Sequence, residues 1–404
     1  MALLAFATGI VVVVLGVAVR AAGQLPPGYR TDPYGGSGTV GMKRYIVLDR
    51  IEFNTSGLYA EITGLYHIWI GVEGGTTDRN CYTLLTNDVG GKYIVQLEFL
   101  HGNYDNLGST SVRFNLMLGV NHWDIVNLDT DDDDYGYRAY TAVFVAWASW
   151  APVCLINIGQ GTPFVSTVEL RPLENLPYPV MANQSLSLFE RRSMRWSADN
   201  DIVRYPDDQY DRYWYAWDLK EDDQASNIST QSPISASQFA VPPRVLETAF
   251  VPAVGNSNEL ILRSKRAEIL PRDHLVILHF AVFQNNKSRQ FAASVDDGTQ
   301  SSPISPGYLS GSSITIWSSD SAGFSVKLTA TAMSDLSPIL NAYEVYGLII
   351  HDNPTTSPQD FDAIMAIKHE YGIKKNWMGD PCFPNNFASD GWCRMQQMSL
   401  MIKL

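Results

Sequence analysis

The feature that most constrains the fold is a series of short apolar segments separated by Gly, Asn and Asp. In the first half of the chain these segments are residues 93–99, 111–118, 142–147 and 153–158. Apolar runs of this length, bounded by turn residues and recurring at short intervals, are typical of β-strands in a sandwich. The sequence therefore predicts an all-β architecture.

A second series of strand-like segments follows, and its pattern repeats that of the first. Residues 97–99 (LEF) are followed by 163–170 (PFVSTVEL), and residues 278–280 (LHF) are followed by 338–345 (PILNAYEV). Both closing segments read Pro, two apolar residues, a polar and a small residue, an apolar residue, Glu and an apolar residue. Repeated patterning of this kind predicts a tandem duplication of one β-sandwich. The remaining strand-like segments of the second series are residues 275–283, 289–295 and 325–331.

One helix is expected, close to the C-terminus. Ser357 is placed as its N-cap, Pro358 as its first residue and Asp360 in its first turn. Apolar side chains then recur at spacings of three and four up to Tyr371, and Gly372 is suited to end the helix. We expect an amphipathic helix that packs on one neighbour and carries no chemistry.

Length and charge limit the classes of function. A chain of 404 residues suits two domains, and its net charge of −13 offers no basic surface for nucleic acid or an anionic membrane. The seven histidines show no metal-ligand spacing and no nucleophile motif accompanies them. We expect a protein that is not an enzyme, with no cofactor, no metal and no nucleic-acid partner.

The N-terminus predicts entry into the secretory pathway. Residues 2–19 are uncharged and apolar, and small residues follow Arg20. Residues 1–23 are therefore interpreted as a signal peptide or an uncleaved N-terminal anchor. This places the rest of the chain outside the cell or at the cell surface, with membrane association through this segment or through a partner. Four glycosylation sequons agree with that compartment, at Asn54, Asn183, Asn227 and Asn286.

The chain has four cysteines. Cys382 and Cys393 lie close in sequence and are predicted to form a disulfide. Cys81 and Cys154 lie in apolar, strand-like segments, and their pattern fits two buried thiols as well as it fits a bridge.

Seven short motifs, in a fixed order, together resemble one family. They are residues 79–84 (RNCYTL), 102–105 (GNYD), 118–123 (LGVNHW), 161–164 (GTPF), 169–173 (ELRPL), 204–212 (RYPDDQYDR) and 376–382 (NWMGDPC). The sequence resembles the malectin-like ectodomains of plant receptor-like kinases, in the branch that carries leucine-rich repeats. One departure is residues 45–51, which lack the cysteine that usually ends the first strand of that family.

The resemblance implies two tandem malectin-type, jelly-roll-like β-sandwiches, at residues 24–175 and 176–352. Residues 353–404 then hold the helix and a cysteine pair that resembles the N-terminal cap of a leucine-rich-repeat stack. A kinase ordinarily follows in the family, whereas this chain stops eleven residues after Cys393. The expectation is a truncated receptor-like protein without a kinase.

Relatives of this fold bind sugars through aromatic rings and carboxylates. The resemblance places Tyr82, Asn103, Tyr104, Asp105 and Trp123 in the matching motifs. We expect these residues to bind an oligosaccharide or cell-wall glycan, with Tyr82 and Trp123 as core aromatics in the competing interpretation. The competing function is recognition of a peptide or co-receptor, with a vestigial sugar site.

Two charged segments receive structural interpretations. Residues 129–134 (DTDDDD) lack the Gly and Glu of a calcium loop and are interpreted as a solvated acidic loop. In residues 204–214, Arg204 and Arg212 are expected to pair with the neighbouring aspartates and to order a loop between the sandwiches.

Overall fold

The computed structural model describes most of the chain from residue 79 onward, and the backbone of three strands before it. The predicted N-terminal segment and the side chains of Asn54, Asn103, Tyr104, Asp105 and Cys393 lie outside the described residues. The described ranges are residues 43–46, 58–62, 66–70, 79–86, 88–101, 108–129, 136–173, 175–195, 202–217, 225–253, 258–263, 273–296, 298–319, 325–371 and 379–384.

The chain divides into two compact units. Unit 1 comprises residues 1–174, 180–185 and 349–404, and unit 2 comprises residues 175–179 and 186–348. The sequence-based division at residue 175 lies beside the first of these boundaries. The C-terminal helix and the described part of the tail belong to unit 1, together with the first sandwich.

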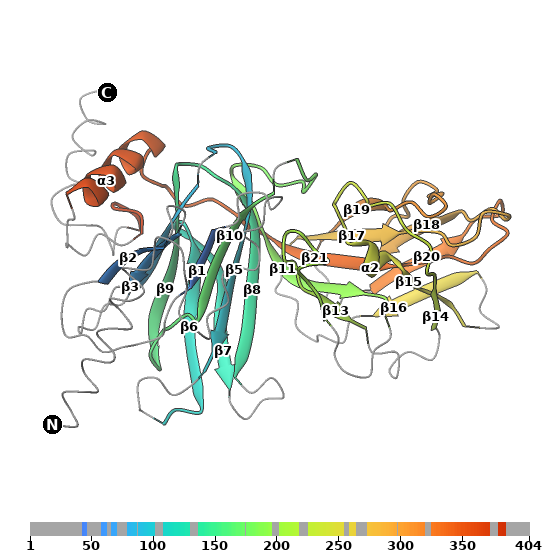
Figure 1. Cartoon of the computed structure of the whole chain (residues 1–404), viewed down its shortest axis with the longest axis horizontal. Coiled ribbons are helices and arrows are strands. Elements are labelled where there is room, and N and C mark those ends of the chain that lie inside the picture. The colour runs from blue at the N-terminus through green and yellow to red at the C-terminus, as the bar shows by residue number, and fades with distance from the viewer. Residues whose placement is uncertain are drawn as a thin grey trace. The chain divides into compact units, whose positions relative to one another are not determined.

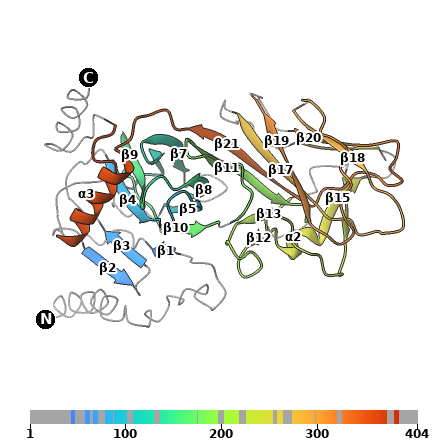
Figure 2. The ribbon, with the colours of Figure 1, turned by 90° about the horizontal axis from the view of Figure 1, so that it is seen from above.

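Unit 1 is a β-sandwich of two antiparallel sheets (Figures 1 and 2). One sheet has the order β1 (Lys43–Ile46), β10 (Thr167–Pro172), β5 (Lys92–Leu100), β8 (Tyr137–Val145). The other has the order β4 (Arg79–Leu85), β9 (Trp150–Gln160), β6 (Ser111–Leu118), β7 (Asn121–Asp129). A separate hairpin joins β2 (Leu58–Ile62) to β3 (Tyr66–Ile70).

Unit 2 repeats this architecture. Its first sheet has the order β11 (Gln184–Ser193), β21 (Ala342–Ile350), β17 (His274–Phe280), β19 (Ser312–Ser318). The short strand β13 (Trp214–Ala216) pairs with β11 in parallel, and β12 (Ile202–Val203) pairs with β13 in turn. A second sheet contains β16 (Glu259–Arg263), β20 (Ser325–Ala330) and β18 (Phe291–Val295). The ribbon β14 (Ala225–Ser229) and β15 (Thr248–Pro252) and the short helix α2 (Pro243–Leu246) complete the unit.

The duplication predicted from the sequence is confirmed by strand register. In unit 1 Leu97 of β5 stands opposite Val168 of β10. In unit 2 Leu278 of β17 stands opposite Tyr343 of β21. These are equivalent positions of the two repeated sequence patterns, so both sandwiches pair the same strands in the same register. The repeated glutamate, Glu169 in one unit and Glu344 in the other, is fully buried in each.

Alternating side chains build a separate core in each unit. Strand β6 alternates exposed or half-buried with buried positions, as expected for a strand with one face inward. Strand β17 is buried at every position, so both of its faces are covered. Because these cores are almost wholly aliphatic and aromatic, burial of apolar surface is the main stabilising contribution.

The C-terminal helix α3 (Pro358–Glu370) forms as the sequence predicts. The Ser357 hydroxyl accepts a hydrogen bond from the backbone N–H of Asp360 at 3.3 Å, which satisfies one free N–H at the helix start. Phe361 and Met365 are buried against Ala148 and its neighbouring tryptophans. Tyr371, expected on the apolar face, is instead exposed. Among the described residues, no helix is both long and apolar enough to cross a membrane.

Cys81 and Cys154 form a disulfide, which resolves the alternative that the sequence left open. They stand directly opposite each other on β4 and β9, with 3.9 Å between their Cα atoms. Their sulfurs are covered by Gly379 of the C-terminal tail, where an added Cβ would lie 2.7 Å from Cys81 Sγ and 2.9 Å from Cys154 Sγ. Cys382 is also disulfide-bonded, and its pairing with Cys393 stays a prediction because Cys393 lies outside the described residues.

Arg79 and Asp380 hold this tail in place. Arg79 donates to the backbone oxygen of Phe383 at 3.2 Å, and burial lowers its pKa to about 10 although Asp380 acts in the opposite direction. The Asp380 carboxylate accepts from the Thr356 hydroxyl at 2.6 Å and from the backbone N–H of Cys382 at 2.9 Å. Residues 379–384 of the tail are therefore a packed part of unit 1.

We predict that Gly379→Ala detaches the tail from the disulfide. Gly379 has a φ of 68°, so an L side chain there costs about 1 kcal/mol or more in backbone strain, and its Cβ also collides with both sulfurs. Reduction of Cys81–Cys154 by a small dithiol should become at least about tenfold faster, measured by thiol labelling in native conditions.

The matched control is Gly159→Ala. Gly159 has a φ of 79°, but an added Cβ there has no heavy atom within 4 Å. It therefore carries the backbone strain without the collision. Equal reduction rates in the two variants would contradict the idea that the tail shields the disulfide.

Candidate ligand-binding site

The described residues of the predicted sugar site do not form an open site. Trp123 on β7 is fully buried in the core of unit 1, so it presents no ring face to a ligand. Tyr82 on β4 is half-buried and packs against the same core. Asn103, Tyr104 and Asp105 lie outside the described residues, and their role stays a prediction.

The predicted glycosylation sites that are described lie on the surface. Asn183, Asn227 and Asn286 are all exposed, as a sequon that carries a glycan must be. Asn227 lies on β14, where its Nδ2 donates to the backbone oxygen of Met194 at 2.9 Å. Glycosylation itself remains a prediction at each position.

The aspartates of residues 204–214 pair with arginines, as the sequence predicts. Arg204 donates to both carboxylate oxygens of Asp211 at 2.9 and 2.6 Å. Arg212 donates to Asp208 at 2.8 Å, and the Trp214 indole donates to the same oxygen at 2.7 Å. All of these residues belong to unit 2, so the loop they order lies within the second sandwich rather than in a linker between the two.

This loop is tied to a buried charge network around Glu344. Arg191 donates to Glu344 at 2.8 Å, and the Tyr346 hydroxyl donates to the same oxygen at 2.6 Å. The Tyr178 hydroxyl donates to Glu344 and accepts from Arg212 at 3.1 Å. The two arginines balance the charges of Glu344 and Asp208, which makes the burial of four ionised groups tolerable.

The pKa values in the network follow from burial and these partners. Burial opposes ionisation of Glu344, but the charge of Arg191 and the hydrogen bond with His279 outweigh it and hold the pKa of Glu344 well below its usual range. Burial lowers the pKa of His279, against the opposing influence of Glu344. The cluster therefore contains a carboxylate that stays ionised and an imidazole that stays neutral.

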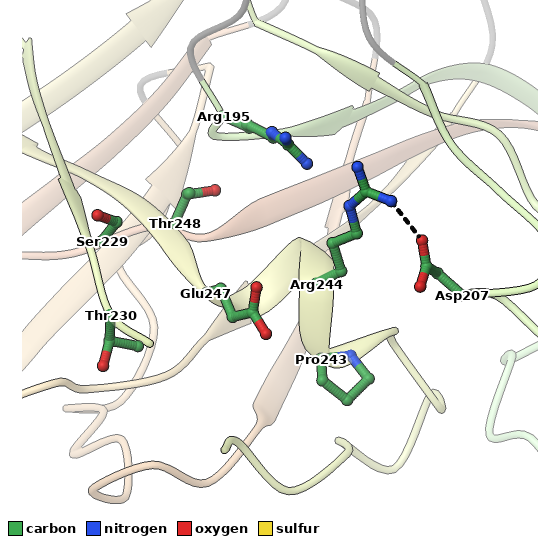
Figure 3. A pocket seen from close by; sticks show the side chains of 8 residues that line it. All are labelled: Arg195, Asp207, Ser229, Thr230, Pro243, Arg244, Glu247 and Thr248. Carbon is green, nitrogen blue, oxygen red and sulfur yellow. Dashed lines mark hydrogen bonds and ion pairs between the residues drawn. The ribbon is translucent and has the colours of Figure 1, made fainter. Parts of the chain in front are cut away.

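A surface pocket adjoins the 204–214 loop at Asp207 (Figure 3). Arg244 on α2 donates to Asp207 at 2.8 Å, and this pair forms one side of the pocket. The cavity has a volume of about 450 Å³. Among the described residues its lining is polar except for one proline, and it includes no aromatic side chain. The lining residues are Arg195, Asp207, Ser229, Thr230, Pro243, Arg244, Glu247 and Thr248.

Hydrogen bonding and ion pairing are the chemistry that this lining offers. It holds two guanidinium groups, two carboxylates and the hydroxyls of Ser229 and Thr230, whereas the Oγ1 atom of Thr248 is buried beneath the surface. No group of His, Cys, Asp and Glu suited to hold a metal ion is found among the residues that the structure describes. The described part of the lining offers no aromatic ring on which a pyranose could stack.

Sequence reasoning missed this pocket. Its residues come from the end of β11, the 204–214 loop, the β14–β15 ribbon and α2, and none of them forms a recognisable motif at fixed spacing. The only available signal was Asp207, which lies inside a motif that carried the family resemblance.

A family model decides the classification. The malectin-like domain model matches residues 75–348, which include strands of both sandwiches and every residue of the pocket. The chain belongs to the malectin-like family. The resemblance seen in the sequence motifs is thereby confirmed.

Relatives that are similar in sequence include receptor kinases of Arabidopsis thaliana. The chain is 32% identical over 321 residues to the probable leucine-rich-repeat receptor-like serine/threonine-protein kinase At1g05700, covering 78% of this chain and 37% of that protein. It is 33% identical over 326 residues to the receptor-like protein kinase At3g21340, covering 78% and 34%. The chain thus spans little more than a third of the length of these relatives.

Solved malectin-like ectodomains share the fold. The ANX2 ectodomain from Arabidopsis thaliana aligns with a TM-score of 0.54 at 12% identity, over 67% of this chain and 82% of that one. The plant receptor-like kinase FER aligns with a TM-score of 0.54 at 14% identity, over 70% and 82%. FER in its complex with the plant peptide RALF23 and LLG2 aligns at 0.51 and 14% identity, over 67% and 81%.

We predict that the second sandwich loses stability on acidification because of His279 and Glu344. Both have folded-state pKa values below their ordinary values of 6.5 and 4.5, so the unfolded chain takes up each proton first as the pH falls. Stability should decline below about pH 6.5 and again below about pH 4.5, by up to about 1.4 kcal/mol per pH unit for each group.

The measurement is urea unfolding between pH 4 and 8, compared with His279→Gln. The variant should lose the decline of the second sandwich that sets in near pH 6.5; His351, whose pKa burial also lowers, belongs to unit 1. Parallel curves for the two proteins would show that His279 does not contribute.

Proposed function

We propose that the chain is the extracellular ligand-recognition module of a receptor-type protein, and that its ligand is a peptide or protein. The observation that carries this proposal is the malectin-like match across both sandwiches, which this chain shares with regions of receptor kinases. The module acts by binding, at the cell surface or outside the cell. The catalytic activity named for the relatives is not assigned to this chain.

Two further observations favour a peptide or protein over a sugar. A structure with the same fold, FER, was solved with the peptide RALF23 and with LLG2. The described pocket of unit 2 offers ionic and hydroxyl groups without an aromatic ring. Peptides present charged side chains and main-chain amides that suit such a lining, whereas sugars bind best where a ring can stack.

Carbohydrate recognition is the second candidate, supported by the motif residues of the first sandwich. Tyr82 is half-buried rather than fully enclosed by the core. Together with Asn103, Tyr104 and Asp105 it would form the sugar site in this proposal. Trp123 is excluded from that site because it is fully buried.

A parallel screen decides between these candidates. We predict that the glycoprotein secreted from the full-length sequence binds members of a soluble peptide library and ignores an array of cell-wall and N-glycan oligosaccharides. The physical reason is that the described lining of the pocket is polar and holds no aromatic ring.

The Tyr104→Ala variant is screened alongside. Glycan binding that this variant loses would overturn the peptide proposal and support the sugar site of the first sandwich. A folded protein that binds neither class would contradict both forms of the recognition proposal.

A further inference from the structure

The charges around the pocket of unit 2 are unequally matched. Arg244 and Asp207 neutralise each other across 2.8 Å, with 45% and 35% of their side chains exposed. The carboxylate of Glu247 has no hydrogen-bond or ion-pair partner among the residues that the structure describes. Glu247 is a half-buried residue, and a carboxylate without a protein partner is the charged group of this pocket that a cationic ligand can pair with.

The backbone of Glu247 is fixed from both sides. Its backbone N–H donates to the carbonyl oxygen of Pro243 at 2.9 Å, and its carbonyl oxygen accepts from the backbone N–H of Thr230 at 2.9 Å. The second bond continues the β14–β15 ladder, in which Ser229 stands opposite Thr248. Glu247 is therefore presented by a rigid backbone, and little ordering entropy remains to be lost when a ligand binds.

Hydroxyl groups line the same pocket as this carboxylate. Figure 3 shows Ser229, the last residue of β14, and Thr230, which follows it, on one side of Glu247, with Arg244 on the other. The Thr230 hydroxyl also accepts from the backbone N–H of Ser232 at 3.1 Å. Hydroxyl oxygens accept hydrogen bonds from ammonium and guanidinium groups, which have three and five N–H donors. Arg195 lines the same pocket and suits an acceptor on the ligand, such as a main-chain carbonyl.

We propose that this pocket binds a lysine or arginine side chain of a peptide ligand. Glu247 is the ionic partner, Ser229 and Thr230 accept further hydrogen bonds, and Arg195 faces the peptide main chain. The inference rests on the proposed function, because it names the part of a peptide that unit 2 recognises. The net charge of −13 adds long-range attraction for a basic partner.

Other ligands fit this lining less well. A neutral sugar supplies hydroxyls, but it leaves the charge of Glu247 uncompensated, and the described lining offers it no ring to stack on. A metal ion would require several oxygen ligands, whereas Glu247 and the ion-paired Asp207 share the pocket with two arginines. A basic side chain satisfies the carboxylate directly.

The test is binding of the full secreted chain to soluble heptapeptide pools in which one position is fixed as Lys, Arg, Gln or Glu. We expect the Lys and Arg pools to bind at least about tenfold more tightly than the Gln pool, and Glu247→Gln to abolish this difference. Binding is measured before and after enzymatic removal of N-glycans, because Asn227 lies two residues before Ser229 on the same face of β14.

Thr248→Val is the matched control within the pocket. The Oγ1 atom of Thr248 is buried and has no hydrogen-bond partner, so no ligand reaches it. Its replacement by a methyl group should leave the peptide preference unchanged and keep or raise the melting temperature. Glu247→Gln should melt close to the wild type, which separates loss of binding from loss of folding.

Each outcome has one meaning. A basic preference that Glu247→Gln removes and Thr248→Val retains supports the proposal. A basic preference that survives in Glu247→Gln overturns the pocket assignment and leaves peptide recognition standing. No peptide binding, with or without glycan binding, overturns the pocket assignment together with the peptide form of the proposed function.

Discussion

The second sandwich depends on the compensation of one buried carboxylate. Glu344 is fully buried on the central strand β21, where an isolated charge would be strongly destabilising. Arg191, His279, Tyr178 and Tyr346 surround it with hydrogen bonds. Loss of a charged partner from such a site typically costs about 3–5 kcal/mol, because the remaining charge is left buried and unpaired.

The same network sets the geometry of the surface. Tyr178 connects Glu344 to Arg212, and Arg212 holds Asp208 within the 204–214 loop. The preceding residue, Asp207, lines the pocket and pairs with Arg244. The pocket is thus bordered by a loop that is anchored in the core, which favours recognition by a preformed site rather than by a mobile loop.

The first sandwich uses the repeated glutamate differently. Glu169 pairs with Arg171, two residues away on the same strand, and both are buried. In the first sandwich, contacts between distant parts of the chain form at another place. Arg79, the Cys81–Cys154 disulfide and Gly379 join the C-terminal tail to the strands β4 and β9. Duplication preserved strand order and register, while the polar contacts of the two copies diverged.

Much of the fold was accessible from the sequence because it depends on local pattern. Short apolar segments bounded by Gly, Asn and Asp indicated strands, the repeated Pro and Glu positions revealed the duplication, and Ser357 and Pro358 marked the start of the helix. The motif at residues 204–212 even predicted its own ion pairs, because arginines and aspartates a few residues apart readily meet in a tight loop.

The site and the burial of individual side chains were decided by tertiary structure alone. An aromatic residue such as Trp123 has the same sequence signature in a core as on a binding surface, and the packing of two sheets placed it in the core. Arg191 and Glu344 are 153 positions apart, and only folding brings them into contact. The sequence by itself determined which strands form and how they repeat. Only the folded chain brings together the residues that decide which charges are buried with a partner. The same residues decide which carboxylate remains for a ligand.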